Sequence, residues 1–395
     1  MGGGLMQLVA YGAQDIYLTG NPQITFFKVV YRRHTNFSME AIEQTLNGTT
    51  GFNKTTTATI SRNGDLVHRM YVEFSMTSAS TFKLSPNAGS ALLKEVELEI
   101  GGQRIDKHYG HWMEAYSQLT EPNTEGLSGA PTTGGLRTDG TLFQNMSGMG
   151  GIAGQNSDIA SSGLEISFIP LQFWFCRNPG LALPLIALQY HEVKVKLTTD
   201  TESNVCASTT GGVFGDFKLW CDYIYLDTDE RRRFAQVSHE YLIEQVQFQE
   251  FGTTTSNELT FNHPVKELVL AGKWDGTASA TSGPSTPVAL VAGTTYQLKL
   301  NGHDRFSARD VKYFTRTQVW QHHKGHGGVN VADSIGVYSF ALKPEEHQPS
   351  GTCNFSRIDN ATLTTTAQTT GLYVYAVNYN VLRIMSGMGG LAYSN

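Results

Sequence analysis

One short pattern occurs twice in this chain, about 200 residues apart. Residues 97–103 read Glu-Leu-Glu-Ile-Gly-Gly-Gln and residues 297–303 read Gln-Leu-Lys-Leu-Asn-Gly-His, so two apolar positions and a glycine coincide. Weaker matches flank this pair in the same order, 62–64 with 261–263 upstream and 219–226 with 374–381 downstream. The spacing between partners shrinks along the chain, as expected for two copies of one unit whose loops differ in length. A chain of 395 residues can hold two such units.

Alternating apolar and charged residues predict β-strands along most of the chain. Val96, Leu98 and Ile100 alternate with three glutamates, which places apolar side chains on one face and hydrated carboxylates on the other. Residues 373–377 are aromatic, small or β-branched, as expected for a strand buried on both faces. Helical periodicity is confined to about residues 110–119. Gly-, Ser- and Thr-rich stretches occupy 121–163, 199–216, 275–295 and 359–371. These features predict an all-β protein with long loops.

The two copies are separated by the densest run of charged residues. Residues 227–233 read Asp-Thr-Asp-Glu-Arg-Arg-Arg, and their opposite charges predict a connector that is solvated or paired at an interface. A boundary there leaves two halves of suitable size for eight-stranded antiparallel β-sandwiches. We predict an N-terminal arm at 1–23, a first sandwich at 24–228, a linker at 229–240 and a second sandwich at 241–395.

The composition argues against several classes of protein. Charged residues make up 16% of the chain and the net charge is −6, whereas proteins that coat nucleic acid carry clustered lysine and arginine. No apolar stretch approaches the roughly 18–20 residues of a membrane-spanning helix. The first residues have neither the charge nor the apolar run of a secretory signal, and Met6 stands where a myristoylation motif has Ser or Thr. We expect a packed protein made in the cytosol.

Several motifs resemble catalytic or cofactor sites but lack the context that such sites need. The pattern G-x-G-x-x-[GA] occurs at 148–153 and 387–392, yet neither copy is followed by the predicted helix that a dinucleotide site requires. Residues 322–326 (His-His-Lys-Gly-His) could suggest metal ligands, but no carboxylate or thiol stands nearby in sequence and the glycines favour a solvated loop. Four scattered cysteines predict free thiols. We expect no catalytic residue, no cofactor and no metal site, and therefore no enzyme.

A carbohydrate-binding β-sandwich, such as a host-wall adhesin, is the alternative interpretation. Exposed aromatic rings can stack on sugars, but the five tryptophans are spread along the chain, which favours core and interface positions. Among the N-x-[ST] sequons, Asn145 is the candidate glycosylation site because it lies in a long predicted loop.

Long segments of the chain follow, in order, the segments of one known family. They include the opening Leu-Val-Ala-Tyr-Gly-Ala-Gln-Asp at 8–15 and Tyr-Leu-Thr-Gly-Asn-Pro-Gln-Ile-Thr-Phe-Phe-Lys at 17–28. Further segments are 31–33, 97–107, 179–193, 239–245, 338–344, 348–363 and 378–395. Through them nearly the whole chain resembles the major capsid proteins of large icosahedral DNA viruses, with the chlorella viruses among the phycodnaviruses as the nearest match.

The resemblance implies a tandem double jelly roll, with three copies forming a trimer of pseudo-hexagonal outline. Such capsomers would tile an icosahedral shell over an internal membrane, with loops outward and the N-terminal arm inward, where it would meet minor capsid proteins. No cofactor and no direct contact with nucleic acid is implied, whereas glycans on outer loops are. The loops at 120–164, 275–295 and 364–371 depart from the family pattern, so the family's glycan sites are not carried over. The chain is thus either the major coat subunit or a capsid paralogue.

Overall fold

The computed structural model divides the chain into two compact units, residues 1–36 and Phe37–Asn395, and the second holds all the elements described below. The predicted arm at 1–23 lies outside the described residues, as do His326 and Trp274. The described residues are 27–31, 34–78, 82–84, 87–122, 141–150, 157–159, 164–206, 212–273, 289–290, 293–325, 327–328, 333–366 and 371–393.

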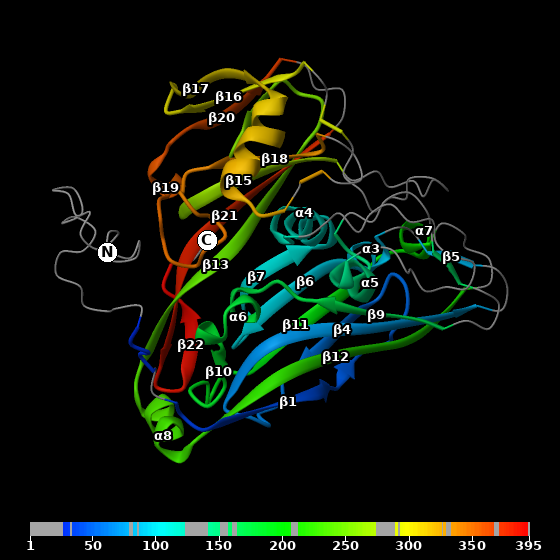
Figure 1. The fold of residues 1–395 in the computed structure, drawn as a ribbon, viewed down its shortest axis with the longest axis vertical. Helices are drawn as coiled ribbons and strands as arrows, with labels where there is room; N and C mark the ends of the chain where they lie inside the picture. The colour runs from blue at the N-terminus through cyan, green and yellow to red at the C-terminus, as the bar shows by residue number, and fades with distance from the viewer. Residues whose placement is uncertain are drawn as a thin grey trace, which may run out of the picture. The chain divides into compact units, whose positions relative to one another are not determined.

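Two antiparallel sheets form a first sandwich from strands β1 to β12 (Figure 1). One sheet has the order β1 (Phe37–Gln44), β12 (Gly212–Leu226), β4 (Leu66–Ser78), with β9 (Leu164–Pro170) and β10 (Leu183–Pro184) both pairing β4. The other has the order β2 (Leu46–Asn47), β3 (Thr55–Thr59), β11 (Val193–Thr199), β6 (Leu93–Ile100), β7 (Gln103–Tyr109). A separate pair joins β5 (Phe82–Leu84) to β8 (Ser157–Ile159).

The second sandwich repeats the order of eight of these strands. One sheet has the order β13 (His239–Phe251), β21 (Leu372–Met385), β15 (Pro264–Gly272), β18 (Ile335–Ser339), with β19 (Cys353–Asn354) pairing β15 and β22 (Met388–Leu391) pairing β21. The other has the order β14 (Ser256–Glu258), β20 (Ala361–Thr365), β16 (Thr295–Leu300), β17 (His303–Asp310). Each sandwich therefore contains the same eight strands, in the orders β1-β12-β4-β9 and β3-β11-β6-β7 in the first and β13-β21-β15-β18 and β14-β20-β16-β17 in the second. This is the eight-stranded jelly roll. The predicted tandem double jelly roll is confirmed.

The repeated sequence pattern marks the same hairpin in both jelly rolls. Gly101 and Gly102 turn between β6 and β7 with φ of 59° and 82°, and Asn301 and Gly302 turn between β16 and β17 with φ of 51° and 79°. Two successive residues with positive φ form the type I′ turn that suits a two-residue hairpin, and glycine and asparagine are the residues that tolerate it. The coincidence in sequence thus reflects one turn geometry used twice.

Short helices connect the strands. They are α3 (Ala88–Leu92), α4 (Gly110–Thr120), α5 (Leu142–Ser147), α6 (Trp174–Arg177), α7 (Glu202–Val205), α8 (Thr228–Gln236), α9 (Val319–His322), the 3-10 turns η1 (Pro179–Leu181) and η3 (Phe355–Arg357), and the π-helical stretch η2 (Tyr313–Gln318). The helix predicted near 110–119 is confirmed as α4. The stretch 121–163 was predicted as loop, and this is wrong for α5, where Thr141 forms a capping box with Gln144. No helix in the described part of the chain is long and apolar enough to cross a membrane.

The charged connector begins with a helix. Asp227 caps α8, and Arg231 of α8 lies 2.9 Å from the carboxylate of Asp65 in the first jelly roll. The domain limits given above, including the linker at 229–240, stay predictions.

Burial follows the predicted alternation. Val96, Leu98 and Ile100 are fully buried, whereas the intervening glutamates are partly exposed and two of them, Glu95 and Glu97, lie within 3.4 Å of Lys107. Strand β21 is buried along its first nine residues, which confirms the two-sided burial predicted for 373–377. Its alternate side chains belong to two different hydrophobic clusters, one inside the second jelly roll and one shared with the first.

Candidate functional site

The two jelly rolls meet along a broad face, and several buried polar groups with shifted pKa values lie there. The outer face of the sheet β13-β21-β15-β18 packs against helix α4 of the first jelly roll. The ring of Trp112 lies 5.0 Å from that of Tyr375, and the ring of His111 lies 4.6 Å from Tyr373 and 4.8 Å from Phe248. The imidazole of His111 also hydrogen-bonds the hydroxyl of Tyr375. Burial lowers the pKa of His111 to about 3, so this ring is neutral at physiological pH.

A buried ionic group crosses this contact. Glu244 on β13 lies 2.9 Å from Arg177 at the end of α6, and 2.9 Å from the amine of Lys266 on β15. Arg177 also donates to the hydroxyl of Tyr116 on α4, over 2.8 Å. Burial disfavours a charged carboxylate, but Arg177, His347 and Lys266 outweigh it and hold the pKa of Glu244 well below its usual range. One carboxylate thus joins a cation of the first jelly roll to a cation of the second.

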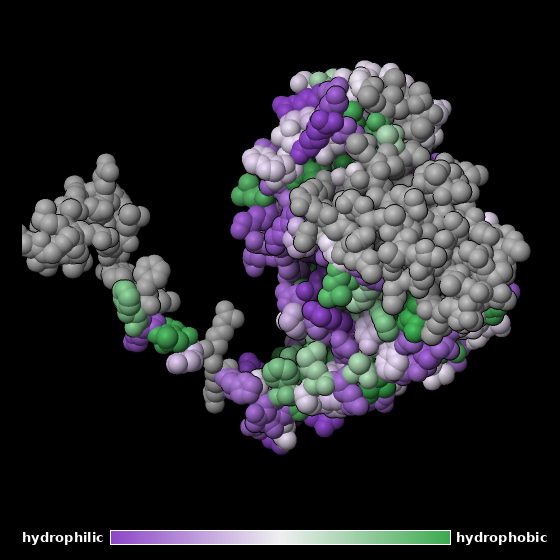
Figure 2. Space-filling model, turned by 45° about the vertical axis from the view of Figure 1, so that its right-hand side comes forward, coloured by the Kyte–Doolittle hydropathy of each residue, from purple (hydrophilic) through white to green (hydrophobic). Residues whose placement is uncertain are grey.

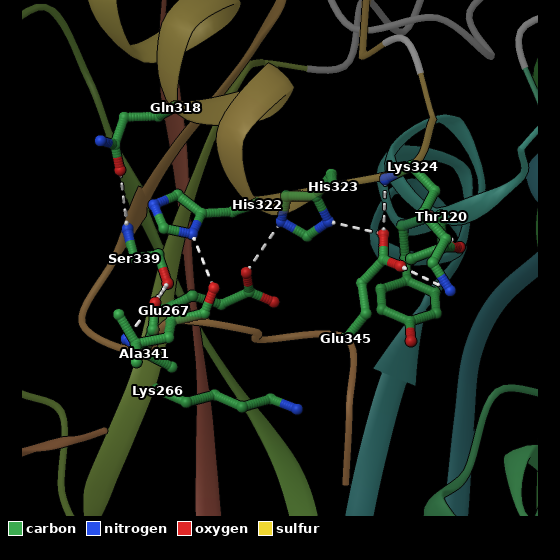
Figure 3. Close-up of polar contacts among 12 residues, drawn as sticks. Thr120, Lys266, Glu267, Gln318, His322, His323, Lys324, Ser339, Ala341 and Glu345 are labelled. Carbon is green, nitrogen blue, oxygen red and sulfur yellow. Dashed lines mark hydrogen bonds and ion pairs between the residues drawn. The ribbon is translucent and has the colours of Figure 1, made fainter. Parts of the chain in front are cut away.

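A second ionic group lies beside it and centres on His323 (Figure 3). His323 follows α9 directly, and its Nε2 lies 2.9 Å from the carboxylate of Glu267 while its Nδ1 lies 3.2 Å from that of Glu345. Glu345 in addition accepts from the backbone N–H of Lys324, over 2.9 Å. The side chain of His323 is 0% exposed, and each of its two ring nitrogens faces a carboxylate.

This corrects the interpretation of the histidine-rich segment as a solvated loop. His323 is buried in an ion pair, because the fold brings it carboxylates from positions 56 and 22 residues away in sequence. His322 points elsewhere and contacts the backbone oxygen of Leu342 at 3.3 Å. Within the described ranges, no group of three or more His, Cys, Asp or Glu side chains is arranged to hold a metal ion.

We predict that His323 makes the stability of the protein depend on alkaline pH. Burial favours the neutral ring, but Glu267 and Glu345 outweigh it and raise the pKa of His323 from 6.5 to about 9. Because the folded pKa is raised, the stabilisation is fully present below pH 6.5 and is lost as the pH rises through 9. This difference corresponds to about 3 kcal/mol. Urea unfolding measures the free energy of unfolding of the wild type and of His323→Gln. The difference between the two proteins should shrink by that amount between pH 6 and pH 9.5. A difference that stays constant over this range would contradict the ion pair.

The second copy of the glycine motif also lies at the junction. Ser386 and Gly387, with φ of 52° and 80°, turn the chain from β21 into β22. Gly389 and Gly390 therefore lie within a strand, where a dinucleotide site would need the start of a helix. The backbone oxygen of Gly389 on β22 lies 2.9 Å from Nδ1 of His191 in the first jelly roll. A Cβ at Gly389 would lie 2.6 Å from Leu188, so glycine allows this close approach. The motif serves packing between the jelly rolls.

The remaining predicted residues are dispersed. Trp112 and Trp174 are each 2% exposed and belong to the core, whereas Trp320 is 81% exposed. Asn145 is exposed on α5, but Ser147 of its sequon is buried and donates its hydroxyl to the backbone oxygen of Phe143. The four cysteines are free thiols, as predicted.

Sequence reasoning missed the residues that make the ionic junction. Arg177, Glu244 and Lys266 stand in no motif. For Glu244 and Lys266 the available signal was a charged residue within an otherwise apolar strand, and Arg177 at the end of α6 gave none. Such groups hold two modules in one relative geometry, since a buried charge is tolerated only beside its partner. In the described structure, the groups with shifted pKa values at this junction pair with one another or pack against neighbouring side chains.

Comparison with known proteins gives a consistent result. The model of the major capsid protein N-terminus matches residues 25–227, and that of the large eukaryotic DNA virus major capsid protein matches residues 230–390. The major capsid protein of Pyramimonas orientalis virus is 53% identical to this chain, and that of Paramecium bursaria Chlorella virus 1 is 43% identical, each covering 100% of both chains. The quasi-atomic model of the PBCV-1 virus capsid contains a chain with a TM-score of 0.77 and 38% identity, covering 94% of this chain and 100% of that chain. The Faustovirus major capsid protein, at 14% identity and a TM-score of 0.69 over 95% of this chain and 94% of its own, shares the fold.

Proposed function

Since this chain belongs to the family of large eukaryotic DNA virus major capsid proteins, we propose that it is a structural subunit of an icosahedral capsid, with three copies forming one tile. The proposal covers both the major coat subunit and a capsid paralogue. It places the protein in the virion and assigns it no catalytic step.

The observation that supports the trimer is the repetition of one jelly roll within one compact unit. Two sandwiches with the same sheet order are fixed to each other by the Trp112–Tyr375 contact and by the ionic groups around Glu244 and His323. Three such chains supply six jelly rolls of the same architecture. Closed rotational symmetry then gives every jelly roll a neighbour on each side. A low content of charged residues, 16%, suits surfaces that are buried between subunits.

Further partners follow from the family and remain proposals. The arm at 1–23 would dock minor capsid proteins below the tile, and the tile would lie over an internal membrane and beside other capsomers. Glycosylation at Asn145 would require local opening of α5, because an acceptor sequon must expose its hydroxyl residue as well as its asparagine, and Ser147 is buried.

We expect the purified protein to be a trimer. Its mass by native mass spectrometry or by light scattering should be about three times 43.3 kDa, because the contact side of each jelly roll is buried only when a neighbouring chain covers it. A stable monomer at micromolar concentration would contradict the proposal.

A further inference from the structure

We infer that residues 386–391, which are the turn after β21 and strand β22, form a strap that the first jelly roll holds closed, and that a chain joins the tile only with its strap closed. Strand β21 corresponds to β12 of the first jelly roll. After β12 the chain continues into α8, whereas after β21 it turns back as β22, at the same end of the molecule as α8 (Figure 1). The part that concerns the tile rests on the proposed function.

Strand β22 has little stability of its own. It contains four residues, two of which are glycines, and within the described sheets it pairs with β21 only. Such a short, glycine-containing strand is marginal without further contacts. Ser386 in the turn has a φ of 52°, a conformation that is unfavourable for a residue with a Cβ. The closed position of the strap therefore depends on what the first jelly roll contributes.

The first jelly roll caps the outer edge of the strap. Nδ1 of His191 lies 2.9 Å from the backbone oxygen of Gly389 and 3.2 Å from its backbone nitrogen, so this ring nitrogen either donates to the oxygen or accepts from the N–H. The side-chain oxygen of Gln103 accepts from the backbone N–H of Leu391 over 3.3 Å. Without these two side chains, β22 would present an open sheet edge, which pairs readily with other chains.

The strap also covers apolar side chains of the first jelly roll. A Cβ at Gly389 would lie 2.6 Å from Leu188 and 3.2 Å from Ile100, so the backbone of β22 lies directly on these two side chains, which are 0% exposed. The described surface already contains hydrophobic residues among hydrophilic ones on the side that Figure 2 presents. Release of the strap would add Leu188 and Ile100 to the exposed apolar surface. Apolar surface beside an open sheet edge favours irregular association.

The repeated turn differs between the two jelly rolls at the place where His191 lies. Gly101 and Asn301 occupy the same position in the two turns. A Cβ at Gly101 would overlap the imidazole of His191, so the turn of the first jelly roll has no room for a side chain there. In the second jelly roll, the side chain of Asn301 is used differently and accepts from the backbone N–H of Asn360 over 3.0 Å. The first jelly roll is thus shaped to seat the imidazole that caps the strap.

Hydrogen exchange followed by mass spectrometry measures opening of residues 386–393 in the purified full-length protein, with circular dichroism to verify folding. We expect exchange there to be about tenfold faster or more in His191→Ala, which lacks the cap, and in Gly389→Ala, whose Cβ would push the strand away from Leu188. Gly390→Ala is the matched control, since a Cβ there would meet only the end of the Gln103 side chain, at 3.3 Å. His191→Asn keeps a polar group near the place of Nδ1. Both of these variants should exchange within about threefold of the wild type.

Mass measurement on the same samples tests the link to the tile. We expect the trimer fraction of His191→Ala and Gly389→Ala to fall about tenfold or more, with heterogeneous larger species in its place, because an open strap leaves a free sheet edge. Gly390→Ala and His191→Asn should remain trimers.

Exchange at the wild-type rate in folded His191→Ala and Gly389→Ala would overturn the strap. Faster exchange with an unchanged trimer fraction would overturn the dependence of the tile on the closed strap and would leave the proposed function intact. A monomeric wild type would instead overturn the proposed trimer, while the exchange rates would still decide whether the strap exists. If Gly389→Ala fails to fold, the comparison of His191→Ala with His191→Asn decides, because His191 is only partly buried.

Discussion

Replacing Glu244 with glutamine is expected to lower the free energy of unfolding by about 3–5 kcal/mol. The side chain is 4% exposed, and its removal as a charge leaves Arg177 and Lys266 without their counter-ion at the junction. The amine of Lys266 belongs to a side chain that is 1% exposed and cannot recover this loss from water, so the cost exceeds that of an ordinary surface pair. Urea unfolding at pH 7 and one fixed protein concentration measures it, since association would otherwise add to the apparent stability.

Glu240→Gln is the control for this experiment. Glu240 stands four residues away on the same strand and pairs with Arg383 at 2.9 Å, but its side chain is 60% exposed. We expect a loss of about 0–1 kcal/mol there. Equal losses for the two variants would show that the ionic group does not hold the jelly rolls together.

Truncation of Trp112 to alanine is expected to cost about 3–5 kcal/mol, because a large buried side chain would leave a cavity between α4 and the second jelly roll. Trp112 is 2% exposed and contacts the rings of both Tyr116 and Tyr375. The same truncation at Trp320 should change the stability of the single chain by less than about 0.5 kcal/mol, because that side chain is exposed.

The contrast between these two tryptophans tests which of the two helix segments is buried within the chain. The single-chain comparison is made at a concentration low enough to dissociate the oligomer. Similar losses for Trp112→Ala and Trp320→Ala under that condition would contradict the burial of Trp112 at the junction and the exposure of Trp320 in the single chain.

Local patterns were sufficient to predict the fold class. Successive side chains of a strand point to opposite faces of the sheet. The alternation in residues 95–100 therefore indicates one buried face, and the apolar run at 373–377 indicates burial of both faces. The repeated turn at 101–102 and 301–302 could be found because a type I′ turn restricts residue type at both positions. These signals depend only on neighbours in sequence.

The junction could not be predicted in this way. His323 is surrounded in sequence by lysine and glycine, which favour a loop, and its partner Glu267 is brought to it only by the fold. Likewise Glu244 is unremarkable in a strand until Arg177 is placed beside it. The surroundings of such residues are formed by segments that are distant in sequence, so neighbouring residues do not predict them.

The shared segment Met-Ser-Gly-Met-Gly-Gly shows the limit most directly. At 146–151 its first residues end helix α5, and Gly148 takes the left-handed conformation with φ of 62°. At 385–390 the same letters form a hairpin in which Ser386 has φ of 52°. Identical local preference is thus compatible with two structures, and the surrounding contacts decide between them.

Electron cryomicroscopy of the purified assembly tests the central claim most directly, that one chain carries two jelly rolls and that three chains form one tile. We expect a ring of three chains with threefold symmetry and six jelly rolls. An assembly without threefold symmetry, or a chain that contributes a single jelly roll, would contradict it.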